Sequence, residues 1–172
     1  MPRTDALARR DLLEDPAAPD ALLAFLTIDH PRLAQPIRVV SDVTDYRIDG
    51  ATWIGIPFDA RPVTDGDGLP EGRLRMEAVT RRLPAALRAV TGRAQVALAL
   101  RSSADFDLGT LPRVPAGPLP PPVYAFERFE LRDIAFDPGQ GVVEGRLAPV
   151  DYTAEPCPAL RATQDVCPGL FW

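Results

Sequence analysis

The stretch that decides the fold is Ala21–Val43, which reads ALLAFLTIDHPRLAQPIRVVSDV. Its first part, Ala21–Ile28, follows a capping aspartate and is too apolar for a helix that stands free in water. Pro31 disfavours the helical conformation at His30, so a helix should end there. The later run Ile37–Val43 is typical of a strand. We therefore predict an apolar helix that packs on a sheet and is joined to the first strand at the only histidine of the chain.

The remainder of the chain alternates between strand patterns and turns. Asp49-Gly50 between two apolar runs is a hairpin signature, and a helix over residues 79–90 is indicated by its capping threonine and its terminal glycine. A first short helix is indicated over residues 4–14. Strand patterns cover residues 37–43, 46–48, 51–58, 72–79, 95–101, 123–136 and 142–147. We predict an α+β fold of mainly antiparallel β character: a β-sandwich or barrel of about six to seven strands with N-terminal helices and one flanking helix.

The length of 172 residues fits one ordinary domain. We expect an N-terminal helical arm over residues 1–19 and a β-barrel or sandwich domain over residues 20–155. A C-terminal docking tail should follow over residues 156–172. The β domain should carry an extended proline-rich arm at residues 111–123.

Twenty prolines are present, and many lie in Pro112–Pro122, which reads PRVPAGPLPPP. Proline fixes φ and removes a hydrogen-bond donor, so this segment should be a polyproline II arm or a long loop. Large apolar side chains at the arm and at the C-terminus should dock on the chain's own core or on a partner. The residues predicted to dock between subunits are Leu111, Val114, Leu119, Val123, Tyr124, Leu170, Phe171 and Trp172.

The charge pattern excludes several classes of function. All 19 basic residues are arginine and the net charge is −5, which excludes Schiff-base chemistry by lysine and disfavours a nucleic-acid-binding protein with a basic face. The longest apolar run is far shorter than the roughly 20 residues of a membrane helix, and the N-terminus lacks the apolar region of a signal peptide. We expect synthesis in a cytoplasm and no membrane partner.

Catalytic motifs are weak. The serines Ser41, Ser102 and Ser103 lie in no nucleophile elbow, and His30 is better explained as a hydrogen-bonding or capping residue than as a base. The acidic segment Asp65–Gly68 lacks the register of a calcium loop and is typical of a solvated turn. We expect no catalytic residue, no cofactor and no metal, and therefore not an enzyme.

Two cysteines lie near the C-terminus, Cys157 and Cys167, and each precedes a proline. A zinc site needs closer spacing and four ligands. Three interpretations stay open: a disulfide that closes the tail, two free thiols, or ligands shared between subunits.

The order of several short motifs resembles that of a small family of minor tail proteins of tailed phages and gene transfer agents. The motifs are Thr27–Pro31 (TIDHP), Ile37–Asp42 (IRVVSD), Trp53 with Pro57-Phe58, the unit Gly72–Val90 followed by Gln95–Arg101, and Cys167–Phe171 (CPGLF). Members of this family are usually described only as a domain of unknown function. Some related hub proteins carry a four-cysteine iron–sulfur site, which a chain with two cysteines cannot reproduce.

The resemblance implies a structural component of the tail tip or baseplate, forming a ring at the distal end of the tail tube and connecting the tube to the hub or fibres. Implied partners are the tube, distal tail and hub proteins and further copies of this chain, as a trimer or hexamer. DNA would pass through the lumen without specific binding. The implied location is the virion tail, and the host cytoplasm during assembly.

Two other functions stay open. The proline-rich arm could make the chain a binding module that recruits a host receptor or another tail protein. Less favoured is a small hydrolase that uses His30 or a cysteine.

Overall fold

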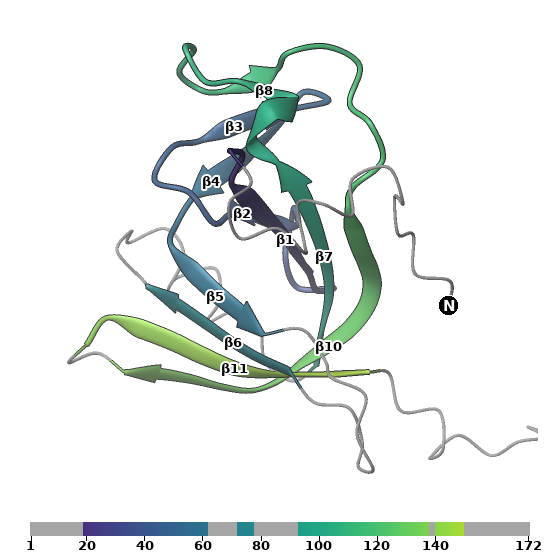
Figure 1. The fold of residues 1–172 in the computed structure, drawn as a ribbon. Coiled ribbons are helices and arrows are strands. Elements are labelled where there is room, and N and C mark those ends of the chain that lie inside the picture. Colours follow the sequence, from purple (N-terminus) through teal and green to yellow (C-terminus); the bar gives the residue numbers. More distant parts are fainter. Residues whose placement is uncertain (1–18, 62–71, 78–92, 138–139, 150–172) are drawn as a thin grey trace, which may run out of the picture.

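The computed structural model of the protein describes residues 19–61, 72–77, 93–137 and 140–149 (Figure 1). Strands make up 62% of these residues, and the one helix among them is the short 3-10 helix Ser103–Asp105. The strands are β1 (Leu22–Asp29), β2 (Ile37–Val40), β3 (Tyr46–Ile48), β4 (Ala51–Gly55), β5 (Phe58–Arg61), β6 (Gly72–Glu77), β7 (Ala94–Ser102), β8 (Phe106–Asp107), β9 (Val114–Pro115), β10 (Tyr124–Asp137) and β11 (Val142–Pro149). The predicted α+β class, with N-terminal helices and a flanking helix, is therefore wrong. The described part of the chain is nearly all β.

The clearest error concerns Ala21–Ile28, which is strand β1 and not a helix. Residues on both faces of β1 are buried: Phe25 points to one side and Leu26 to the other, and both are almost inaccessible to solvent. A strand covered on both faces has a continuous apolar run in place of an alternating one. Over a run this short, the pattern does not distinguish such a strand from a buried helix.

Nine strands form one mixed sheet in the order β3-β4-β2-β1-β7-β10-β11-β6-β5. All neighbours in it pair antiparallel except β2 and β4, which are parallel. The predicted six to seven strands were too few, because this sheet alone has nine strands and β8 and β9 form a second, two-stranded sheet.

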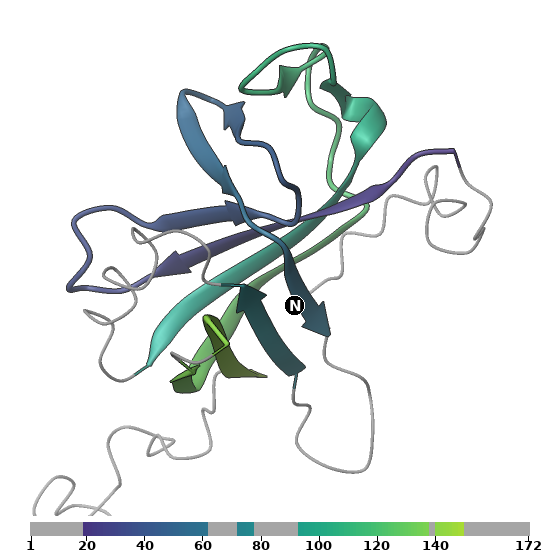
Figure 2. The same cartoon turned by 90° about the vertical axis from the view of Figure 1, so that its left-hand side faces the viewer.

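The sheet curls until its two ends are joined by the chain itself. β4 lies near one end of the strand order and β5 at the other, yet only Ile56 and Pro57 separate them. The backbone N–H of Ile56 donates to Val40 O at 3.0 Å, and that of Glu77 donates to Pro57 O at 3.2 Å. Backbone hydrogen bonding therefore continues through Ile56 and Pro57 to strands at both ends of the sheet order. The sheet is curled (Figures 1 and 2), and an apolar core lies inside it.

Strand β10 is long and irregular, and it pairs with β7 on one side and with β11 on the other. Its pairing with β7 shifts register between Phe126 and Phe129, and its pairing with β11 shifts between Arg132 and Ala135. Within the second irregularity Asp133 has a left-handed backbone, with φ of 54°. Such bulges increase strand bending, and β10 turns from the upper to the lower part of the sheet in Figure 1.

Two apolar cores result. The barrel core lies inside the curled sheet and draws on β1, β2, β4–β7, β10 and β11, with Leu26, Met76 and Phe129 among its fully buried residues. The cap core lies on the other face of β1, β2 and β7 under β3, β4, β8 and the arm. There the Phe25 ring contacts the rings of Tyr46, Trp53 and Phe106 at centroid separations of 5.6, 5.2 and 5.5 Å. Edge and offset aromatic pairs of this kind stabilise a core beyond the area they bury.

Several local predictions are confirmed. The Asp49-Gly50 hairpin forms between β3 and β4, and both turn residues have positive φ, as a type I′ turn requires. Strand β6 lies within the strand predicted over residues 72–79, and its residues alternate between buried and exposed. The predicted helices at residues 4–14 and 79–90 and the C-terminal tail lie outside the described residues.

Candidate docking surface

The proline-rich arm packs back onto its own barrel. Arg101 Nη1 donates to Pro120 O at 2.7 Å, and the Val123 N–H donates to Leu100 O at 2.8 Å. β9 within the arm pairs with β8, and Arg113 forms a parallel bridge with Tyr46. The arm therefore packs against the cap core and does not extend freely into solvent.

This packing decides what the predicted docking residues contact in the described chain. Val123 is buried, Leu119 packs against the cap core and Tyr124 against the barrel core, while Val114 is half-buried in β9. Leu111 alone of these five is exposed. Leu170, Phe171 and Trp172 lie outside the described residues, as do Cys157 and Cys167. The role of this set in contacts between subunits stays a prediction.

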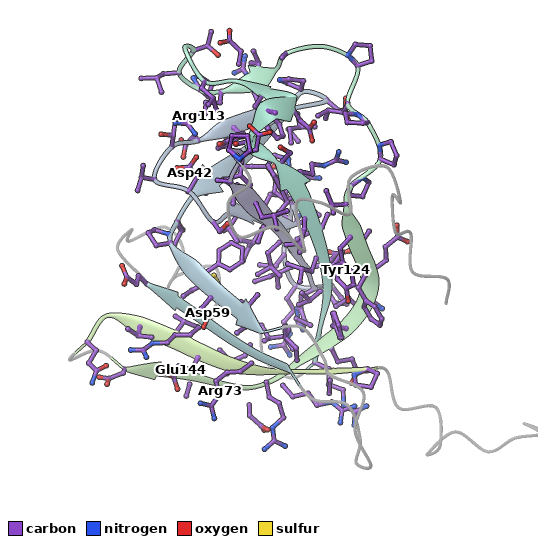
Figure 3. The ribbon with its side chains drawn as sticks, viewed as in Figure 1. Asp42, Asp59, Arg73, Arg113, Tyr124 and Glu144 are labelled. Atoms are coloured by element: carbon purple, nitrogen blue, oxygen red, sulfur yellow. The ribbon has the colours of Figure 1, made fainter. Side chains whose placement is uncertain are left out.

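A polar cluster of Asp42, Tyr46 and Arg113, here called the clamp, fixes the arm to the loop between β2 and β3. Asp42 and Arg113 are labelled in Figure 3. Arg113 Nη1 donates to Asp42 Oδ2 at 2.5 Å and to the Tyr46 hydroxyl at 2.8 Å, and that hydroxyl donates to Asp42 Oδ2 at 2.6 Å. The Arg113 side chain is 22% exposed and that of Asp42 14%. Charge-assisted hydrogen bonds shielded from water in this way are stronger than surface ion pairs.

The clamp also changes the acid–base properties of its members. Burial raises the pKa of Tyr46 to about 12; the hydrogen bond to Asp42 adds to the rise and the hydrogen bond from Arg113 opposes it. The Tyr46 hydroxyl in turn raises the pKa of Arg113. Tyr46 is therefore neutral and Arg113 charged throughout the physiological range, so the clamp persists across that range.

Backbone contacts hold the same two segments together. The Arg113 N–H donates to Asp45 O at 2.9 Å, and the Arg47 N–H donates to Arg113 O at 2.8 Å. The Asp45 carboxylate accepts from the Gly55 N–H at 2.9 Å. A Cβ on Gly55 would lie 2.5 Å from Thr44 O, so only glycine permits this approach of the loop to β4. The β2–β3 loop is therefore held at Asp42 by the clamp and at Asp45 by hydrogen bonds, and Thr44 between them packs closely on Gly55.

The loop between β8 and β9 is ordered by its own side chain. The Asp107 carboxylate accepts from the Gly109 N–H at 2.9 Å, and Thr110 Oγ1 donates to the Asp107 carbonyl at 3.2 Å. Aspartate side chains that bond the backbone two residues onward are a standard means of fixing turns.

These two loops carry the three large hydrophobic side chains that are exposed among the described residues: Val43 at 82%, Leu108 at 52% and Leu111 at 80%. We call this set the tip. The β8–β9 loop lies at the end of the molecule away from β6 and β11 (Figure 1), and the clamp joins the β2–β3 loop to it. Apolar side chains on fixed loops suit a binding surface, because a partner need not order them on contact.

His30 lies in the turn after β1, not at a helix end. It is buried, its Nδ1 accepts from the Arg32 N–H at 3.1 Å, and its carbonyl accepts from the Leu33 N–H at 2.9 Å. In the described part of the chain, no group of three or more metal-ligating side chains could hold an ion. No helix there is long and apolar enough to cross a membrane. The acidic segment Asp65–Gly68 lies outside the described residues.

In the described part of the chain, the fold and the tip define a class: a nearly all-β protein with two cores and exposed apolar side chains on two hydrogen-bonded loops. The chain matches the model of the DUF1833 family, a domain of unknown function, over residues 8–116, and it belongs to that family. The match includes the clamp and the tip. No curated protein matches the chain.

Proposed function

We propose that this protein is a structural component of the tail tip or baseplate of a phage or phage-like particle. In that role it forms a ring at the distal end of the tail tube and connects the tube to the hub or fibres. The observation that carries the proposal is the tip: Val43, Leu108 and Leu111 are exposed on two loops that the clamp joins. A permanent assembly would bury these side chains.

Two further features support this role. The motif order described above resembles that of minor tail proteins, and most of those motifs lie within strands that build the barrel. The net charge of −5 suits a lumen through which DNA passes without binding. Partners would be the tube, distal tail and hub proteins. The protein would reside in the virion tail and, during assembly, in the host cytoplasm.

A second candidate is a binding module for a host receptor or another tail protein, and the exposure of Leu111 on the arm favours it. The two functions predict different defects. A structural subunit is needed to complete the tail, whereas a receptor-binding module is needed only for attachment.

The test is deletion of the gene in the producing host, followed by complementation and electron microscopy of the particles. The structural role predicts incomplete or absent tails, rescued by the wild-type chain but not by Leu111→Asp. Complete particles that fail only to adsorb would support the binding module. Rescue by His30→Ala would contradict a hydrolase that uses His30.

A further inference from the structure

We infer that the tip of one copy seats on the β1–β2 turn of a second copy, so that identical subunits associate head to tail. This inference rests on the proposed structural role and names the two surfaces that meet. The two surfaces lie at opposite ends of β1, and they are apolar at their centres and opposite in charge at their borders.

The tip is acidic at its border. Asp45 in the β2–β3 loop and Asp107 at the start of the β8–β9 loop are exposed, and both carboxylates are held by backbone N–H groups. Asp42 is already neutralised by Arg113. Among the described residues, Arg47 is the exposed cation in this region, so the carboxylates there outnumber the cations that Asp42 does not already neutralise.

The β1–β2 turn, residues 30–36, is apolar with a basic border. Pro31 and Ala34 are exposed and Leu33 is half-buried, while His30 fixes the turn through the two hydrogen bonds described above. Among the residues that the structure describes, the cations at this end are Arg32, Arg38 and Arg93, and the carboxylates are Asp29 and Glu130. Glu130 also binds Arg132 at 2.6 Å, so the border as a whole is positive.

The two surfaces cannot meet within one molecule. The β2–β3 loop lies beside the start of β1, where the Ser41 N–H donates to Ala24 O, whereas the turn follows its last residue, Asp29. The five residue steps from Ala24 to Asp29 span about 17 Å at roughly 3.3 Å per residue. Figure 2 shows the turn projecting away from the β8–β9 end.

Charge selects the arrangement between copies. A tip-to-tip contact would bring Asp45 and Asp107 of two copies together, and like charges across an interface oppose binding. A tip-to-turn contact pairs these carboxylates with arginines and covers both apolar centres. Such a contact uses two different surfaces of the same chain, and it generates a closed ring when the rotation between copies closes. Because the apolar centre is small, we expect reversible association in the micromolar range.

The first test is sedimentation velocity of the full chain over a range of concentrations. The wild type should associate as its concentration rises, and Leu111→Asp should remain monomeric. Ala135→Asp places the same charge at an exposed position of β10 and should behave as the wild type. Circular dichroism confirms that each variant is folded.

A charge exchange tests the pairing itself. A basic-tip variant carries Leu108→Arg and Leu111→Arg, and an acidic-turn variant carries Arg32→Glu and Arg38→Glu. Each alone should be monomeric because its own tip and turn repel. An equal mixture should regain association, since every contact then joins opposite charges.

Three results would overturn the inference: a wild type that stays monomeric at all concentrations, variants that associate as the wild type does, or a mixture that fails to regain association. A monomeric wild type that is nevertheless found in particles would remove only the self-contact and leave the structural role in place.

Discussion

Arg113 Nη1 lies 2.5 Å from Asp42 Oδ2 and thereby joins two segments 71 residues apart in the sequence. One segment carries Val43 and the other Leu111, so the same contact positions two of the three tip side chains. This ion pair therefore contributes both to the stability of the fold and to the geometry of the proposed interface.

Replacing Arg113 by methionine should lower the free energy of unfolding by about 2–4 kcal/mol, because Asp42 would keep its charge in a shielded place without its partner. The matched control is Arg75→Met. Arg75 lies 3.6 Å from Glu144 with both side chains about half exposed, and a surface pair of this kind contributes about 0–1 kcal/mol. Urea denaturation measures both, and equal losses would show that the clamp is no stronger than a surface pair.

Tyr46 should make the protein sensitive to alkali. Its pKa is about 12 in the folded chain against 10.0 for a free tyrosine, so the folded state favours the neutral form. The resulting stability is fully present below pH 10 and is lost as the pH rises from 10 to 12, a loss of about 2–3 kcal/mol. Tyr46→Phe removes this pH-dependent part of the free energy of unfolding, because phenylalanine does not ionise. The free energy of unfolding should therefore fall more steeply over this window for the wild type than for Tyr46→Phe, and parallel pH curves would contradict the burial argument.

Gly55→Ala should destabilise the β2–β3 loop. The new Cβ would lie 2.5–2.7 Å from backbone atoms of Thr44, and overpacking of this kind costs about 1–3 kcal/mol. Gly117→Ala is the control, since nothing lies within 4 Å of its added Cβ. Thermal unfolding should show a lower midpoint for Gly55→Ala and a nearly unchanged one for Gly117→Ala. Similar midpoints would mean that the loop moves away at little cost.

Phe25→Ala and Leu26→Ala should both be strongly destabilising, by about 3–5 and 2–5 kcal/mol, although the residues are adjacent. Each fills a different core, because β1 is buried on both faces. Thr27→Ala, at a half-buried position, should cost much less. Chemical denaturation measures all three, and a small effect at either core residue would contradict the two-core architecture.

The same strand explains what could and could not be predicted from the sequence. Strands with one exposed face, such as β6, alternate regularly and were predicted correctly. The Asp49-Gly50 turn was equally clear because its chemistry is local. The helix predicted in place of β1 was wrong because the second buried face of this strand exists only once the cap folds over it.

The clamp and tip depend on long-range contacts in a similar way. Asp42, Tyr46 and Arg113 form no local motif, and no sequence signal indicates that they meet. Leu111 was identified because it is a large apolar residue in the arm. Leu119 and Val123 are equally apolar, yet Leu119 packs on the cap core and Val123 is buried. Exposure within the arm is decided by how the arm folds back, which composition does not reveal.

The most direct test of the structural role is the protein content of purified particles, measured by quantitative mass spectrometry. We expect this chain to be present in every preparation at a fixed copy number, a multiple of three per tail. Its absence from particles that are complete and infectious would contradict the proposed role.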